Sequence, residues 1–287
     1  FVAETTDLPY LPHLPNRDAS EGMLRQWAEG LCGAGATDDG IGLRYGEDSE
    51  ALVDAFGGAR AMLDRAEGTE LKTQFTGPLT LFLALLAAGC PYDGLWDCVV
   101  EGLVERVRAH IDMITSARPD VNVIAVMDEP ALVTFAPGRS NNPVPIDTAA
   151  DAIVTVMAGS PVPVGIHVCG DTDWRMVAGL QPAWISWDLA ALGDGFLNAT
   201  DAIAETVSHG TGIMWGMVPT DPAPLDTDRI RSRYGTAVTR LVIDGAPTEA
   251  LTEASLATPA CGLAGVSVGG ADVVMGRLRD VVEMVDA

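Results

Sequence analysis

Hydrophobic residues along this chain fall into short runs that alternate with segments of mixed character. The runs are rich in valine and isoleucine, and each ends in a cluster of polar, glycine or proline residues. Near-continuous apolar runs of this kind are typical of strands that are buried on both faces of a parallel sheet. The runs lie at residues 71–78, 121–130, 163–170, 183–190, 212–219 and 256–263, and a further candidate lies at 8–14.

Between these runs, apolar residues recur every three to four positions, which predicts amphipathic helices. The helical segments are 49–66, 95–116, 148–157, 201–209, 227–243 and 271–285. Strands that alternate with helices predict βα units around a parallel sheet. Their number favours an eight-stranded (βα)8 TIM barrel whose first strand is weakly represented or lies upstream of Phe1, as a single domain over residues 1–287. A doubly wound sheet is the alternative, although it usually carries a glycine-rich nucleotide loop, which this sequence lacks.

One pair of predicted strands ends in side chains that can bind a metal. His167 and Cys169 stand two residues apart at the end of one run, and Cys261 closes another. Residues i and i+2 of a strand point to the same side, so His167 and Cys169 can reach one point. Each of these residues taken alone would more commonly be a buried core side chain. Together they predict a Zn²⁺ site with an open fourth position, as in catalytic zinc centres.

Carboxylates end two other runs. Asp128 and Glu129 precede a proline, and the pair could bind an ammonium group, act as a general base, or lie at a helix N-terminus. Asp188 ends the run that follows the His-x-Cys strand. It could be the fourth zinc ligand, a hydrogen-bond partner of His167, or a helix N-cap.

Two further segments are candidates for contact with a substrate. Thr76 and Gly77 belong to a Thr-Gly-Pro turn at a strand end, where a small molecule could approach the backbone closely. The loop at 135–145, which is rich in proline, glycine and asparagine, is the best candidate for a mobile flap.

Composition excludes some partners. The net charge of −23 disfavours binding to nucleic acid or to an anionic membrane surface. The longest apolar stretch, Leu79–Cys90, is too short to span a bilayer. Five cysteines in 287 residues do not suggest a disulfide framework, so we expect reduced thiols and a cytoplasmic protein.

The order of these motifs resembles a known family. Thr-Gly-Pro, Asp-Glu-Pro, His-x-Cys and Cys-Gly-Leu follow one another as they do in the C-terminal catalytic barrel of cobalamin-independent methionine synthase. The resemblance covers about Leu71 to Ala287. The same superfamily contains uroporphyrinogen decarboxylase and zinc-dependent methyltransferases that act on corrinoid proteins.

The resemblance implies a function for each motif. His167, Cys169 and Cys261 would be the zinc ligands, and Asp188 falls near a glutamate ligand of the synthases. Asp128 and Glu129 resemble the acids that hold the amino group of homocysteine. The implied reaction is zinc-dependent methyl transfer to a thiol such as homocysteine, from a folate or a corrinoid protein.

The sequence departs from the family on the methyl-donor side. The synthases carry a histidine proton donor in a Gly-x-x-Asp-x-His-Ser-Pro stretch, and the corresponding residues 215–222 contain no histidine. Three alternatives therefore stay open: a corrinoid-protein-dependent methyltransferase, a metal-free enzyme resembling uroporphyrinogen decarboxylase, and a non-catalytic protein that binds zinc or a thiol metabolite.

Overall fold

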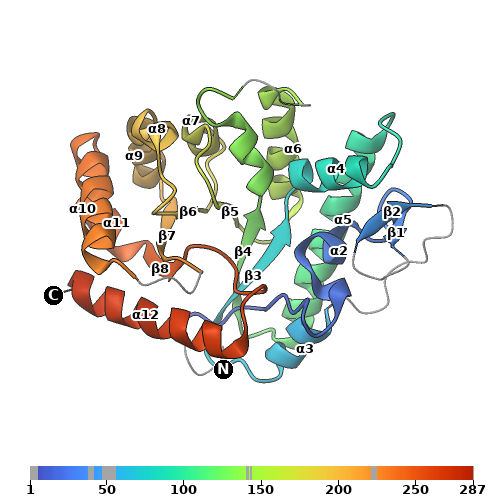
Figure 1. Cartoon of the computed structure of the whole chain (residues 1–287), viewed down its shortest axis with the longest axis horizontal. Coiled ribbons are helices and arrows are strands. Elements are labelled where there is room, and N and C mark those ends of the chain that lie inside the picture. The colour runs from blue at the N-terminus through green and yellow to red at the C-terminus, as the bar shows by residue number, and fades with distance from the viewer. Residues whose placement is uncertain are drawn as a thin grey trace. The chain divides into compact units, whose positions relative to one another are not determined.

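The structure is a computed structural model that describes residues 6–37, 42–46, 56–139, 142, 144–220 and 225–286. The chain divides into two compact units, and their helices and strands are labelled in Figure 1. Unit 1 comprises residues 1–131 and 144–164, and unit 2 comprises residues 132–143 and 165–287. The prediction of one domain over residues 1–287 stays a prediction.

Unit 1 contains a pair of parallel strands with helices packed against it. Its elements are η1 (Ala19–Glu21), α2 (Met23–Ala28), β1 (Ala34–Ala36), β2 (Leu43–Tyr45), α3 (Gly57–Leu63), β3 (Glu70–Thr76), α4 (Pro78–Ala87), α5 (Leu95–Ala117), β4 (Asn122–Asp128) and α6 (Ile146–Gly159). Strands β3 and β4 pair in parallel from Glu70↔Asn122 to Thr76↔Asp128. The short 3-10 helix η2 (Pro130–Phe135) follows β4 and crosses into unit 2.

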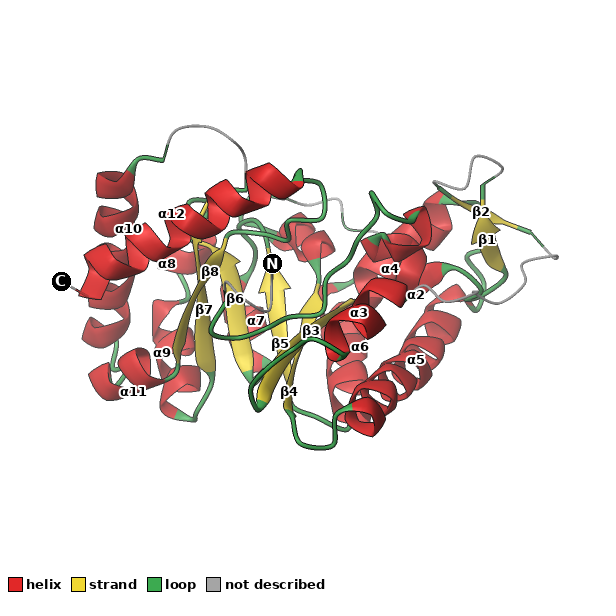
Figure 2. Ribbon diagram, turned by 90° about the horizontal axis from the view of Figure 1, so that it is seen from below, coloured by secondary structure: helices red, strands yellow, loops and turns green. Residues whose placement is uncertain are grey.

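Unit 2 contains four parallel strands in the order β5-β6-β7-β8, drawn in yellow in Figure 2. Its elements are β5 (Val164–Val168), α7 (Trp174–Gly179), β6 (Trp184–Asp188), α8 (Asp194–Leu197), α9 (Thr200–Ser208), β7 (Gly212–Val218), α10 (Thr227–Ile243), α11 (Thr248–Glu253), β8 (Ser255–Pro259) and α12 (Val268–Asp286). Both units are therefore α/β structures built on parallel strands.

Alternation along β6 separates a packed side from a polar side. Trp187 of β6 is fully buried and meets Trp174 of α7 edge to face, with ring centroids 5.5 Å apart. Trp215 of β7 continues this aromatic row at 5.2 Å from Trp187 and 5.0 Å from Tyr234 of α10. Because neighbouring residues of a strand point to opposite sides, Ser186 and Asp188 lie on the other face of β6. The aromatic row thus packs on one side of β6 and β7. The polar residues Ser186 and Asp188 lie on the opposite side of β6.

Most of the predicted elements are confirmed. The six apolar runs form β3 to β8, and the segments at 95–116, 148–157, 201–209, 227–243 and 271–285 form helices. Of the helix expected at 49–66, residues 49–55 lie outside the described residues, and the rest contains α3. The loop at 135–145 also lies partly outside them, so its role as a flap stays a prediction.

The early strand expected at 8–14 is reduced to a single bridge. Tyr10 pairs in parallel with Lys72 of β3, whose amide donates to the Pro9 carbonyl at 2.8 Å. Prolines at positions 9, 12 and 15 lack the amide donor that a longer ladder needs, which explains why the pairing stops.

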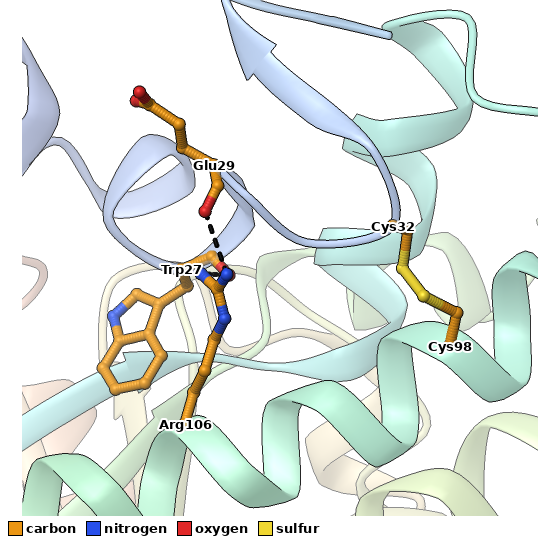
Figure 3. The surroundings of a disulfide bond; sticks show 5 residues. All are labelled: Trp27, Glu29, Cys32, Cys98 and Arg106. Carbon is orange, nitrogen blue, oxygen red and sulfur yellow. Dashed lines mark hydrogen bonds between the residues drawn. A yellow bond between two sulfur atoms is a disulfide. The ribbon is translucent and has the colours of Figure 1, made fainter. Parts of the chain in front are cut away.

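The prediction of reduced cysteines is wrong for one pair. Cys32, after α2, and Cys98, in the first turn of α5, form a disulfide across a sequence separation of 66 residues (Figure 3). Nearby, the Arg106 side chain donates to the carbonyls of Trp27 at 3.0 Å and Glu29 at 2.9 Å. The sequence spacing gave no sign that the end of α2 packs against α5. A cytoplasmic location, which partly depended on reduced thiols, stays a prediction.

None of the helices in the described part of the chain is both long and apolar enough to cross a membrane.

Candidate metal centre

Three of the predicted site residues come together in unit 2. His167 lies on β5, Cys169 follows the end of β5, and Cys261 lies two residues past β8. One ligand atom from each residue lies within 4.8 Å of the others. Because the carboxyl ends of parallel strands meet at one edge of a sheet, Cys169 and Cys261 lie close together although they are 92 positions apart in the chain. The set provides one imidazole nitrogen and two sulfur atoms.

The imidazole of His167 is oriented by the next strand. Its Nδ1 lies 2.9 Å from the hydroxyl oxygen of Ser186, and the two residues are paired in the β5–β6 register. The other ring nitrogen, Nε2, is buried and has no hydrogen-bond partner among the described residues. A buried polar atom without a partner costs free energy. A metal ion on Nε2 would satisfy it, and a hydrogen bond on the far nitrogen is the usual arrangement of a ligating histidine.

The two thiols disfavour each other's ionisation. The hydrogen bond with Cys169 raises the pKa of Cys261 to about 12, against the opposing effect of the neighbouring His167. Two thiolates side by side repel each other unless a cation lies between them. A divalent metal supplies that charge and deprotonates its thiol ligands. The donor set therefore fits zinc.

Asp188 lies at the end of β6 but is not a member of this group of three. Its Oδ1 accepts a hydrogen bond from the Ala190 amide at 2.8 Å, as in a turn. Burial raises the pKa of Asp188, while His167 and Arg233 act in the opposite direction. Asp188 thus stabilises the turn after β6 through its hydrogen bond to Ala190. It also interacts electrostatically with His167.

The acid pair lies in unit 1, and its two members differ. Asp128, the last residue of β4, is half-buried. Glu129 is completely buried, and its carboxylate accepts hydrogen bonds from the amides of Leu79 at 3.0 Å and Thr80 at 2.8 Å. Burial raises the pKa of Glu129 to about 7, although these hydrogen bonds lower it.

The Thr-Gly-Pro turn packs directly against this acid. Thr76 is fully buried, and its hydroxyl donates to the carbonyl of Met23 at 2.8 Å. A Cβ atom on Gly77 would lie 2.2 Å from Oε2 of Glu129, so only glycine fits there. The space beside the Gly77 backbone, which the sequence suggested for a substrate, is thus occupied by the carboxylate of Glu129.

Two residues near the metal group were not found from the sequence. Ser186 contacts His167, and Arg233 of α10 donates to the carbonyl of Ala190 at 2.6 Å, beside Asp188. Ser186 had a signal, because it is a polar residue between apolar neighbours two positions before a candidate ligand. The position of Arg233 depends on how α10 packs, which the sequence pattern does not reveal.

The fold is similar to that of two solved structures. A protein from Listeria monocytogenes, provisionally described as a vitamin-B12-independent methionine synthase, aligns with 91% of this chain and 76% of its own, with a TM-score of 0.58 and 13% identity. A B12-independent methionine synthase from Shewanella sp. W3-18-1, in complex with selenomethionine, aligns with 80% of this chain and 64% of its own, with a TM-score of 0.52 and 14% identity. The chain thus spans less than two thirds of the Shewanella protein. No family model and no curated protein matches the sequence. At these identities the likeness establishes the fold.

Proposed function

We propose that this protein is a zinc-dependent methyltransferase that transfers a methyl group to a thiol such as homocysteine, on a fold that completes a (βα)8 barrel. The observation that carries the proposal is the His167, Cys169 and Cys261 group with its buried, unpartnered Nε2 atom. Likeness in fold to two proteins described as methionine synthases supports it.

The protein's own residues would hold and orient the metal. Cys169 and Cys261 would ligate as thiolates and His167 through Nε2, with Ser186 fixing the ring from behind. Zn²⁺ held by these residues would supply a Lewis acid that lowers the pKa of a substrate thiol, so that a thiolate would be available at neutral pH. Asp188 is the proposed fourth ligand or a partner of His167, to be distinguished by its effect on zinc affinity.

Recognition of the amino group would fall to Asp128. A half-buried carboxylate at a strand end can pair with an ammonium group, whereas the carboxylate of Glu129 already accepts three hydrogen bonds. Thr76 and Gly77 would shape the neighbouring backbone. The methyl donor would be a folate or a methylated corrinoid protein.

Metal analysis of protein purified without added zinc tests the first half of the proposal. We expect about one zinc per chain. Cys169→Ser and Cys261→Ser should lose it, while Cys90→Ala, which changes a buried cysteine outside the group, should keep it. A folded protein that contains no zinc and takes up none would refute the proposal.

A methyl-transfer assay tests the second half. Zinc-loaded protein is incubated with homocysteine and, in separate reactions, methyltetrahydrofolate or a methylated corrinoid protein, and methionine is measured. Tight binding of zinc and homocysteine with no turnover for either donor would favour the non-catalytic binding protein, which the lack of a histidine in residues 215–222 keeps open. A metal-free decarboxylase-like enzyme is disfavoured because the grouped side chains are a histidine and two thiols, with no arginine among them to hold substrate carboxylates.

A further inference from the structure

The carboxylate of Glu129 serves as the cap of a helix that lies 50 residues earlier in the chain. Helix α4 begins at Pro78, and its N-cap residue, Gly77, offers no side-chain hydrogen bond. The amides of Leu79 and Thr80 lie in the first turn, where no helical carbonyl is available. Both donate to Glu129 instead, at 3.0 Å and 2.8 Å.

The backbone amides at this turn are thereby fully accounted for. The Gly77 amide donates to the carbonyl of Asp128 at 2.9 Å, Pro78 has none, and Leu81 donates to the Gly77 carbonyl at 3.1 Å. The two remaining amides are those bound by Glu129. A carboxylate is favoured here by the positive end of the helix dipole as well as by the hydrogen bonds.

The same carboxylate also holds the chain beyond β4. The Thr80 hydroxyl donates to Oε1 of Glu129 and accepts from the Ala131 amide at 3.1 Å. The backbone is therefore tied to the start of α4 before and after Glu129, at Asp128 and at Ala131. A side chain at position 77 would not fit, because a Cβ atom there would lie 2.2 Å from Oε2 of Glu129.

Asp128, between these ties, is the member of the pair whose side chain remains available. It is half-buried, and its carboxylate is a charged neighbour of His13 instead of a partner of the helix amides. Its backbone, in contrast, is fixed by the β4 ladder and by the amide of Gly77.

We propose that Glu129 is a positioning residue: it clamps the first turn of α4 to the end of β4 and so fixes Asp128, the carboxylate that binds the substrate amine. The proposal rests on the proposed function for the role of Asp128. Glu129 itself does not touch the substrate, because both of its oxygens are occupied and its side chain is completely buried. A glutamine would keep the bonds from Thr80 but would set an amide group against the Leu79 N–H.

Hydrogen exchange tests the clamp without any assay of activity. Amides in the first turn of a helix normally exchange rapidly because they lack a helical partner. We expect slow exchange at Leu79 and Thr80 in the wild type and at least about tenfold faster exchange in Glu129→Ala. Trp96 and Asp97, at the uncapped start of α5, are the internal control and should exchange rapidly in both proteins.

Kinetics test the positioning of Asp128. Homocysteine is compared with 4-mercaptobutanoate, which has the same thiol and carboxylate but no amino group. Glu129→Ala should raise the KM for homocysteine by about tenfold or more and leave the KM for 4-mercaptobutanoate and the zinc content unchanged. Glu253→Ala, at an exposed glutamate of α11, is the matched control and should change neither.

A conservative pair at Thr80 covers the case in which Glu129→Ala does not fold. Thr80→Ser keeps the hydroxyl that links Glu129 to Ala131, and Thr80→Val removes it at the same volume. Only Thr80→Val should speed exchange at residue 80 and raise the homocysteine KM.

Each outcome decides between the two proposals. Unchanged exchange at Leu79 and Thr80 in Glu129→Ala would overturn the clamp. An equal rise in KM for homocysteine and for 4-mercaptobutanoate would overturn the positioning of Asp128. If the wild type holds no zinc and transfers no methyl group, the proposed function fails, and the exchange experiment alone then decides the clamp.

Discussion

The strand ends of the two units carry polar residues in similar positions but in opposite states. In unit 1, Glu129 is surrounded by donors, and each oxygen of its carboxylate has a partner. In unit 2, His167 has Ser186 on one nitrogen and no partner among the described residues on the other. Unit 1 is also braced by the Cys32–Cys98 disulfide, whereas Cys169 and Cys261 lie outside any disulfide.

The comparison teaches that position at a strand end does not by itself identify a residue that meets a ligand. Glu129 and His167 are equally well placed by the βα pattern, and Glu129 is completely buried while His167 is half-buried with a buried Nε2 atom. What differs is whether the protein satisfies the polar atoms itself. Satisfied atoms stabilise the structure, while the buried Nε2 atom of His167, which lies beside two thiols, is placed to meet a metal.

The largest expected effect is loss of the metal from unit 2. His167→Ala removes the nitrogen ligand, and the remaining two thiols cannot hold zinc tightly. We expect zinc to fall from about one per chain to a small fraction, as measured by atomic emission after dialysis. Asp128→Asn in unit 1 is the control and should retain full zinc. If His167→Ala kept the full complement, the ligand set would be wrong.

The next largest effect concerns the Cys32–Cys98 disulfide in unit 1. Cys98→Ser opens a covalent loop of 66 residues, which removes a constraint on the unfolded chain. We expect the free energy of unfolding to fall by about 2–4 kcal/mol in urea titrations under non-reducing conditions. Adding a reductant should lower the stability of the wild type to that of the variant. If the reductant left the free energy of unfolding of the wild type unchanged, the disulfide would not stabilise the protein.

Glu129 predicts a pH dependence of stability. Burial raises its pKa in the folded protein to about 7, above the ordinary value of 4.5 for a glutamate. The folded state therefore binds the proton more tightly than the unfolded state. Its stabilising contribution is present below the unfolded pKa and is lost as the pH rises through about 7, by about 3 kcal/mol in total.

The measurement is the difference between the wild type and Glu129→Gln. Urea unfolding is followed between about pH 5 and about pH 8, where other groups titrate equally in both proteins. The stability of the wild type should fall relative to the variant across this range. Parallel pH profiles would show that Glu129 keeps an ordinary pKa.

The sequence predicted most of the elements and the metal group, and the reason is physical. Apolar runs and helical periodicity report burial directly, so β3 to β8 and α10 could be located within a few residues. His167, Cys169 and Cys261 could be grouped because the ends of parallel strands meet at one edge. The structure provides what depends on packing between distant segments: the Cys32–Cys98 disulfide and the cap that Glu129 forms on α4. No local pattern encodes either pairing.

The smallest effect that we predict concerns the Nδ1 atom of His167, the ring nitrogen that faces Ser186. Ser186→Ala removes the hydroxyl 2.9 Å from Nδ1 and leaves Nε2 and both thiols in place. Residues that orient a ligating histidine typically contribute about 10–100-fold to metal affinity, so competition with a chelator should show a loss in that range with zinc still binding at high concentration. Ser186→Thr, which keeps the hydroxyl, should restore most of the affinity. If Ser186→Ala bound zinc as tightly as the wild type, the ring would be oriented by packing alone, and the polar face of β6 would contribute to the metal group only through Asp188.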